Sequence, residues 1–174
     1  MKKLCIALAL LVQALWAQAP KADSNPLSTN NKFMYTIGKS TILRSAEKMP
    51  EENYAFKPAP EVRSFGAIIG HVADSQYGFC SAVSGEKHDS DIEKSVTSKA
   101  DLVQALKEAF AYCDKVYDSL TDATATEKVK FFGADRPKLA VLAFNNMHNY
   151  EHYGNIVTYM RLKQLVPPSS EPRK

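Results

Sequence analysis

The chain has 174 residues, of which 45% are hydrophobic, 22 are Lys or Arg and 19 are Asp or Glu. This length fits one domain that can bury a hydrophobic core. The formal net charge of +3 is too small for the basic stripe that contacts with nucleic-acid phosphates require, so nucleic acid is not an expected partner.

The N-terminus has the layout of a secretory signal peptide. Two lysines precede an almost unbroken apolar run over residues 4–15, and small residues follow at Ala17 and Ala19. This run is shorter than the roughly 20 residues that span a bilayer. We expect export to the periplasm or the medium, with cleavage after Ala17 or Ala19; an uncleaved anchor is the alternative. The rest of the chain has no second apolar stretch, so no integral membrane span remains after cleavage.

A linker and a first helix are predicted next. Residues 20–30 are rich in Pro, Ser, Asn and Asp, which favours a linker. Residues 32–49 have helical composition, and a proline ends this helix. Residues 50–61 contain three prolines around Tyr54 and Phe56, which predicts an extended connection fixed by the two aromatic side chains.

Clear end signals mark the second and third helices. Ser64 is a good N-cap for a helix that runs to about Ser84 and stops at Gly85. Residues 85–97 are polar and predict a loop that crosses the end of a bundle. Ser98, followed three residues later by an Asp, begins a third helix. Its apolar positions share one face: Leu102, Leu106, Ala109, Cys113, Tyr117 and Leu120.

The last helix is predicted after an irregular stretch over residues 121–135. Pro137 stands in its first turn, and the helix runs to about Leu165, where two prolines forbid its continuation. No segment alternates over the length of a strand. The sequence therefore predicts an all-α protein, a four-helix bundle with one crossing connection.

Three of the four histidines suggest a metal site. His148 and His152 are one helical turn apart, so their rings project from one face about 6 Å from each other. No Glu follows the first of them, which excludes the zinc metalloprotease motif. His71, on the second helix, is the candidate for a third ligand. For the pair, the alternatives are a polar patch inside the bundle and a partly solvated face. For His71, the alternative is a core residue that is hydrogen-bonded to the backbone. His88, in the charged loop, is expected on the surface.

Two segments are similar to the signatures of the DinB-like family. Residues 49–58 with 64–73, which include His71, resemble the first signature, and residues 148–162 with the closing Val-Pro-Pro resemble the second. The resemblance covers roughly residues 31–168. It implies a four-helix bundle of up-down-down-up topology, in which the crossing connection joins helices 2 and 3. It also implies a histidine triad that binds a divalent metal and maps onto His71, His148 and His152.

The sequence signals and the resemblance together predict the following domain organisation. Residues 1–19 are the signal peptide and 20–30 the linker, 31–166 form the DinB-like bundle, and 167–174 form a disordered tail. Members of known activity are thiol-dependent transferases and isomerases, in which the metal activates a small cytosolic thiol such as mycothiol or bacillithiol. An exported chain would meet little of these thiols.

Two functions therefore stay open. One is a metal-dependent transferase or hydrolase that acts on a small-molecule substrate, because three imidazole ligands leave an open coordination position. The other is a non-catalytic metal- or ligand-binding bundle, since no convincing base or nucleophile accompanies the triad. Zinc or nickel is the expected ion, with iron, manganese or copper as alternatives. The sequence leaves the oligomeric state open, with a homodimer as one alternative.

The metal hypothesis fixes what the structure should contain. The three ligand nitrogens should lie within about 4 Å of each other, and a solvent-open pocket lined by the first, second and fourth helices should reach them. Glu151 is a candidate partner of a ligand, and Asn145 is a candidate pocket residue. The alternative for Glu151 is a solvated side chain on the helix surface, and the alternative for Asn145 is a hydrogen bond in the core.

The remaining polar and aromatic candidates have a simpler interpretation. Three tyrosines are expected to pack in the bundle rather than bind substrate: Tyr150, Tyr153 and Tyr159. Arg161 lies near the end of the last helix, where its positive charge is expected to interact favourably with the helix dipole.

Cys80 and Cys113 are candidates for a disulfide, because export permits one. In the family-like topology their helices run parallel and the two residues have nearly the same height. Two small buried thiols are the alternative.

Overall fold

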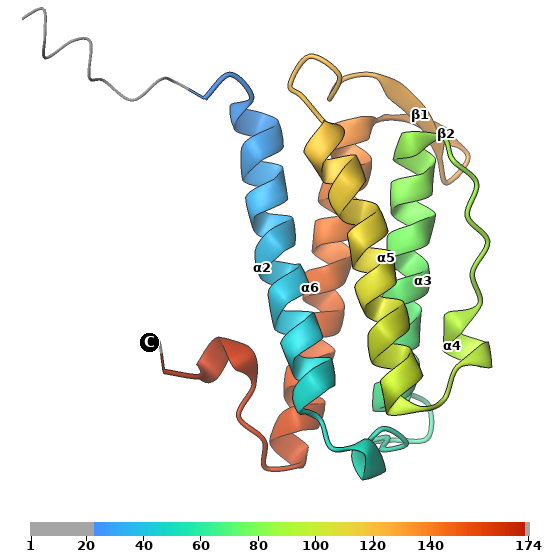
Figure 1. The fold of residues 1–174 in the computed structure, drawn as a ribbon, viewed down its shortest axis with the longest axis vertical. Coiled ribbons are helices and arrows are strands. Elements are labelled where there is room, and N and C mark those ends of the chain that lie inside the picture. Colours follow the sequence, from blue (N-terminus) through green and yellow to red (C-terminus); the bar gives the residue numbers. More distant parts are fainter. Residues whose placement is uncertain (1–22, 173–174) are drawn as a thin grey trace, which may run out of the picture.

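Four long helices form the body of the molecule. The computed structural model describes residues 23–172, so the predicted signal peptide lies outside the described residues. The long helices are α2 (Pro26–Lys48), α3 (Phe65–Ser84), α5 (Lys99–Ser119) and α6 (Lys138–Leu162) (Figure 1). The short elements are η1 (Glu51–Asn53), α4 (Ile92–Ser95), β1 (Lys128–Phe131), β2 (Ala134–Pro137) and η2 (Pro168–Ser170).

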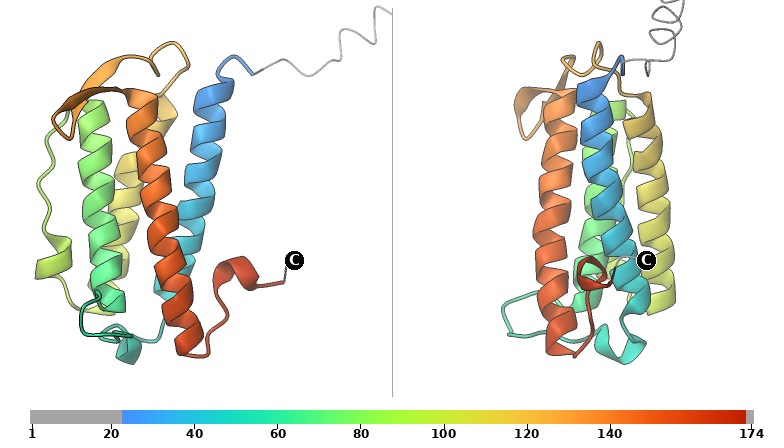
Figure 2. Two further views of the ribbon diagram at one scale, coloured as in Figure 1. Left: turned by 180° about the vertical axis from the view of Figure 1, so that it is seen from behind. Right: turned by 90° about the vertical axis from the view of Figure 1, so that its left-hand side faces the viewer.

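The helices are arranged with the predicted up-down-down-up topology. In Figure 1, α2 and α6 run downward, whereas α3 and α5 run upward. Residues 85–98 cross the length of the bundle to connect the two parallel helices. α6 packs against α2 and α3, and α5 packs against the same two helices (Figure 2). The all-α four-helix bundle and its crossing connection are confirmed.

Local end signals act as the sequence predicts. The Ser64 hydroxyl accepts a hydrogen bond from the amide of Ala67, and the Ser98 hydroxyl accepts one from Asp101. Gly85 ends α3 with a φ of 81°, a left-handed conformation that favours glycine. Because each signal lies within three residues of its helix end, the second and third helices are predicted almost to the residue.

α2 begins at Pro26, inside the predicted linker and six residues before the predicted start. The Asp122 carboxylate accepts hydrogen bonds from the free amides of Leu27 and Ser28. A distant residue thus satisfies amides that no local side chain caps, and the linker prediction is wrong from residue 26 onward.

The predicted disordered tail is wrong for the residues that the structure describes. Pro168 is buried, and Glu171 pairs with Arg44 and Lys48 of α2. The last helix also ends at Leu162, three residues earlier than expected.

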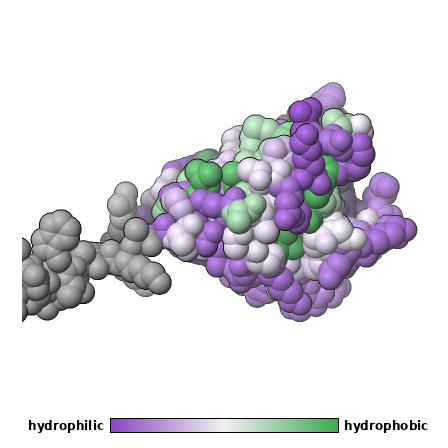
Figure 3. Space-filling view, turned by 90° about the horizontal axis from the view of Figure 1, so that it is seen from above, coloured by the Kyte–Doolittle hydropathy of each residue, from purple (hydrophilic) through white to green (hydrophobic). Residues whose placement is uncertain are grey.

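A short β-hairpin replaces part of the predicted irregular stretch. β1 pairs with β2 in antiparallel register, and the two turn residues have positive φ, 48° at Phe132 and 75° at Gly133. Phe132 is 79% exposed. The hairpin lies at the end of the bundle that Figure 3 views, where hydrophobic patches interrupt a largely hydrophilic surface.

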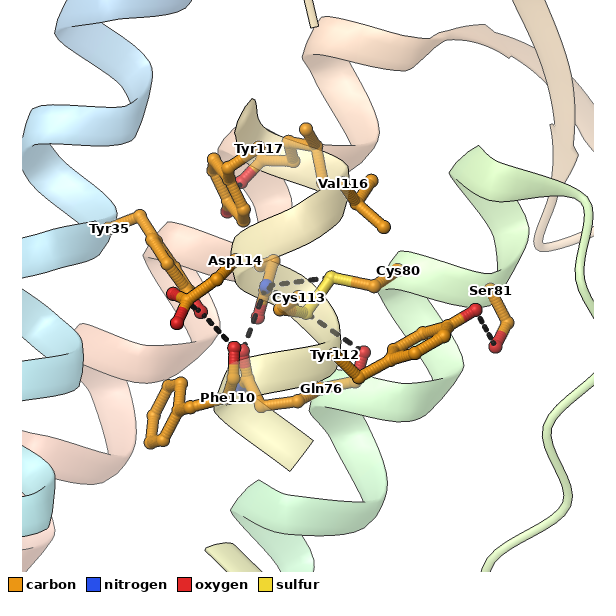
Figure 4. The surroundings of a disulfide bond; sticks show 12 residues. Tyr35, Gln76, Cys80, Ser81, Phe110, Tyr112, Cys113, Asp114, Val116 and Tyr117 are labelled. Atoms are coloured by element: carbon orange, nitrogen blue, oxygen red, sulfur yellow. Dashed lines mark hydrogen bonds between the residues drawn. A yellow bond between two sulfur atoms is a disulfide. The ribbon is translucent and has the colours of Figure 1, made fainter. Parts of the chain in front are cut away.

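The Cys80–Cys113 disulfide is present and joins α3 to α5 (Figure 4). The two Cα atoms are 5.5 Å apart and both side chains are fully buried. The predicted pairing is confirmed. A closed loop with a separation of 33 residues stabilises a fold by about 3 to 4 kcal/mol in the chain-entropy picture.

The hydrophobic core fills the space between the four helices. Its largest fully buried side chains include Tyr35, Ile42, Phe65, Leu106, Phe110, Tyr117, Leu142 and Ile156. None of the described helices is long and apolar enough to cross a membrane.

Candidate metal centre

Three histidines meet where α3 packs against α6. Nε2 of His148 lies 3.2 Å from Nε2 of His71 and 3.1 Å from Nε2 of His152. The three ligand atoms all lie within 4.8 Å of one another, somewhat wider than the expected 4 Å. The structure therefore brings the three predicted residues together, and among the described residues no fourth His, Cys, Asp or Glu joins this group.

The electrostatics of these rings fit a divalent cation. Burial, and then the neighbouring histidines, lower the pKa of His148 to about 3. Burial is also the largest cause that lowers the pKa of His152, to about 4. Both rings are therefore neutral at pH 7, with a nitrogen lone pair available. Three neutral imidazole nitrogens facing one point are the donor set that zinc, nickel and similar ions take.

Glu93 is a partner of the site that the sequence analysis missed. Its Oε2 atom lies 3.0 Å from Nδ1 of His71, and its Oε1 atom accepts a hydrogen bond of 2.8 Å from Nε of Arg63. Burial opposes ionisation of this carboxyl group, but Arg63 and His71 together lower its pKa. Glu93 comes from α4, in the crossing connection, where no sequence motif marks it.

Glu151 and Asn145, the two predicted accessory residues, do not have the predicted roles. Glu151 is exposed beside the site, and no hydrogen bond joins it to a histidine among the described residues. Asn145 is fully buried and its amide donates to the side chain of Gln76, so it is a core residue. Gln76 in turn donates to Asn149, the neighbour of His148 in the chain. This buried network holds the middle of α6 against α3.

A cavity of about 740 Å³ that is open to solvent reaches the cluster at one of its histidines, His152, which forms part of the cavity wall. The predicted walls from the second and fourth helices are present, but residues 57–64 stand where the first helix was expected. The other lining residues are Lys57, Pro58, Pro60, Glu61, Val62, Arg63, Ser64, Ala67, Ile68, Glu93, Glu151, Asn155 and Tyr159.

The remaining candidates lie mostly apart from the histidines. His88 is exposed and stacks on Tyr77, with ring centroids 3.7 Å apart. Tyr150 donates to the carbonyl of Met34, and Tyr153 accepts from the amide of Ser169. Arg161 is exposed in the last turn of α6.

Tyr159 is the one predicted packing residue that also borders the cavity. Its hydroxyl donates to the carbonyl oxygen of Arg63 and so ties α6 to residues 57–64.

Comparisons with known proteins agree with this architecture. Residues 35–156 match a family model for the DinB superfamily. A DinB-like protein from Bacillus cereus has 19% identity and a TM-score of 0.68, covering 79% of this chain and 93% of its own. A DinB-like protein from Bacillus subtilis has 19% identity and a TM-score of 0.61, covering 78% and 93%.

A solved enzyme also has this fold. A mycothiol-dependent maleylpyruvate isomerase has 14% identity and a TM-score of 0.58, with 74% of this chain and 60% of that chain covered. The comparison with curated proteins finds no match.

Proposed function

The chain belongs to the DinB superfamily, and we propose that it is an exported metalloprotein whose three histidines hold a divalent ion for chemistry on a small molecule. The observation that carries the proposal is the convergence of three histidine rings from two helices, whose ligand atoms all lie within 4.8 Å of one another. A buried imidazole nitrogen without a partner costs free energy, and one shared cation would bind the lone pairs of all three Nε2 atoms. Zinc or nickel is the proposed ion, with iron or manganese as alternatives.

Catalysis is favoured by the vacant side of the site. Three protein ligands leave at least one coordination position open, and a cavity of about 740 Å³ is large enough for a small substrate. The chemistry that such an ion supplies is Lewis acidity, which polarises a carbonyl group or lowers the pKa of a thiol or water. Asn155 and Arg63 offer hydrogen-bond donors along the cavity wall to orient the substrate.

The reaction class we propose is transfer or hydrolysis. The mycothiol-dependent isomerase shows that a protein of this fold supports chemistry that depends on a small thiol. If this chain carried out thiol-dependent chemistry, the substrate would have to supply the thiol, because the two cysteines among the described residues form a disulfide.

A non-catalytic metal-binding bundle is the second candidate. It is favoured by the composition of the cavity wall. The hydroxyl of Ser64, the one serine that lines the cavity, already caps α3, and none of the described cysteines lines the cavity.

Export is proposed from the basic and apolar layout of the N-terminus. The disulfide supports it, because such bonds persist mainly in oxidising compartments. The N-terminal sequence of protein recovered outside the cytoplasm tests this part: a start at residue 18 or 20 is expected, and an intact Met1 would contradict cleavage.

Elemental analysis tests the metal site. The mature protein, purified without a histidine tag, is expected to hold about one divalent ion per chain. Replacement of His71, His148 or His152 by Ala should abolish this content. A wild-type protein that takes up no zinc, nickel, iron or manganese would overturn the proposal.

A further inference from the structure

We propose that the crossing connection is part of the metal centre, because α4 carries Glu93 as a positioning residue for His71. This inference rests on the proposed metal site and adds a function for a segment that otherwise only links two parallel helices. α4 lies beside α3 (Figure 1). Its role is to fix which ring nitrogen of His71 carries the proton and in which direction the other nitrogen points.

The first step is the hydrogen bond to the ring. Oε2 of Glu93 lies 3.0 Å from Nδ1 of His71, on the side of the ring away from the other histidines. A carboxylate accepts only, so Nδ1 must hold the proton and Nε2 must present its lone pair to the cluster. The second carboxylate oxygen accepts from Arg63, which stops Glu93 from rotating away.

The second step is the attachment of α4 to α3. Asp74, three residues after His71, accepts hydrogen bonds from the amides of Ile92 (2.8 Å) and Glu93 (2.9 Å), one to each carboxylate oxygen. The backbone of Glu93 is therefore anchored to the same helix that carries the histidine. Glu93 and His71 are therefore both fixed to the same turn of α3.

The third step is a glycine that permits this contact. A Cβ atom on Gly70 would lie 2.7 Å from Cα of Glu93 and 3.0 Å from its nitrogen. Both atoms belong to the backbone, so no side-chain rotation could relieve the clash. Gly70, His71 and Asp74 thus form one turn of α3 that receives α4 and orients the ligand.

The competing explanation is that Glu93 merely anchors a loop. Its side chain and that of His71 are 28% and 24% exposed, and partly exposed ion pairs contribute little to stability. An anchor of this kind would affect the melting temperature and leave metal affinity unchanged. Metal affinity therefore separates the two roles.

The first experiment measures Zn²⁺ affinity of the mature protein by competition with a chromophoric chelator. Glu93→Ala is expected to weaken binding by about tenfold or more, and Glu93→Gln, which keeps an acceptor oxygen, by less. Asp91→Asn is the matched control, since Asp91 is exposed in the same connection and pairs only with Lys94 among the described residues. Unchanged affinity in Glu93→Ala would overturn the proposal.

A pair of glycine variants tests the contact separately. Gly70→Ala should displace α4 and weaken Zn²⁺ binding about as much as Glu93→Ala. Gly78→Ala is its control on the same helix, because a Cβ there meets no atom within 4 Å. Equal affinities for the two glycine variants would contradict the role of Gly70.

Nuclear magnetic resonance keeps the test independent of the proposed function. In metal-free protein at about pH 8, where imidazole is neutral, His71 should be protonated at Nδ1 in the wild type and shift toward the Nε2 tautomer in Glu93→Ala. If the wild type bound no metal, the proposed function would fail, and this measurement would still decide whether Glu93 positions the ring. A tautomer unchanged by Glu93→Ala would overturn the inference.

Discussion

Nε2 of His148 lies 3.1 Å from Nε2 of His152, one helical turn further along α6. The two nitrogens face each other, and neither ring is expected to carry a charge at pH 7. Such an arrangement gains most from a cation between the rings, and it makes His148, which also faces His71, the central ligand.

The first prediction concerns ligand-induced stability. Zn²⁺ at about 100 times its dissociation constant should stabilise the wild-type protein by about 2.7 kcal/mol, because the unfolded chain has no preformed site. His148→Gln should remove the zinc-induced rise in melting temperature. His88→Gln is the control and should keep it, since His88 stacks on Tyr77 away from the cluster. An equal rise in His148→Gln would rule out this cluster as the site.

The second prediction concerns the disulfide. The denatured, unreduced mature protein should show no free thiol, and the Cys80→Ala/Cys113→Ala variant should lose about 3 to 4 kcal/mol of unfolding free energy. Thiol titration and denaturant unfolding measure the two effects. Reduction of the wild type should lower stability similarly, whereas the double variant should not respond to reductant. Two free thiols in the unreduced protein would refute the bridge.

The third prediction is a pH dependence of the metal-free protein. His148 and His152 have pKa values near 3 and 4 in the folded state and about 6.5 when unfolded. The unfolded state therefore binds more protons below about pH 6.5, so stability that is present above this pH is lost as the pH falls. Each group contributes at most about 1.4 kcal/mol per pH unit.

Denaturant unfolding between about pH 7 and pH 5 measures this slope, in a range that largely avoids carboxylate titration. The His148→Gln/His152→Gln variant should show a shallower dependence. Parallel curves for the two proteins would show that these histidines are not responsible.

The fourth prediction compares Gly85, which caps the end of α3, with Gly78, which lies inside this helix. Gly85 has a φ of 81°, so Gly85→Ala should cost about 1 kcal/mol. Gly78 lies inside the helix with open space around it, so Gly78→Ala should stabilise by about 0.5 to 1 kcal/mol. Thermal unfolding of both variants checks the opposite signs. A shift of the same sign in both would contradict the assigned backbone conformations.

A structural feature could be predicted from the sequence where the residue that signals it lies close in the chain to the residues it affects. Ser64, Ser98 and Gly85 act on neighbouring residues, so the ends they set could be predicted. The start of α2 depends on Asp122, which is 95 residues from Leu27 and has no local signature.

The same distinction holds for the site. His148 and His152 are linked by helical spacing, and the family resemblance adds His71. Glu93 depends on a contact between the crossing connection and Gly70 that only the folded chain creates. The tail was missed for a similar reason, since its anchors are Arg44 and Lys48 of α2.

The crossing connection lies entirely between the two bridged cysteines. Residues 84–91 are exposed, which makes them a natural target for a protease. A single cut there would produce two pieces, one containing Cys80 and the other Cys113, that remain covalently joined through sulfur. Such a nicked molecule would migrate as one species without reductant and as two with it. It would keep His71 together with the helix that carries His148 and His152.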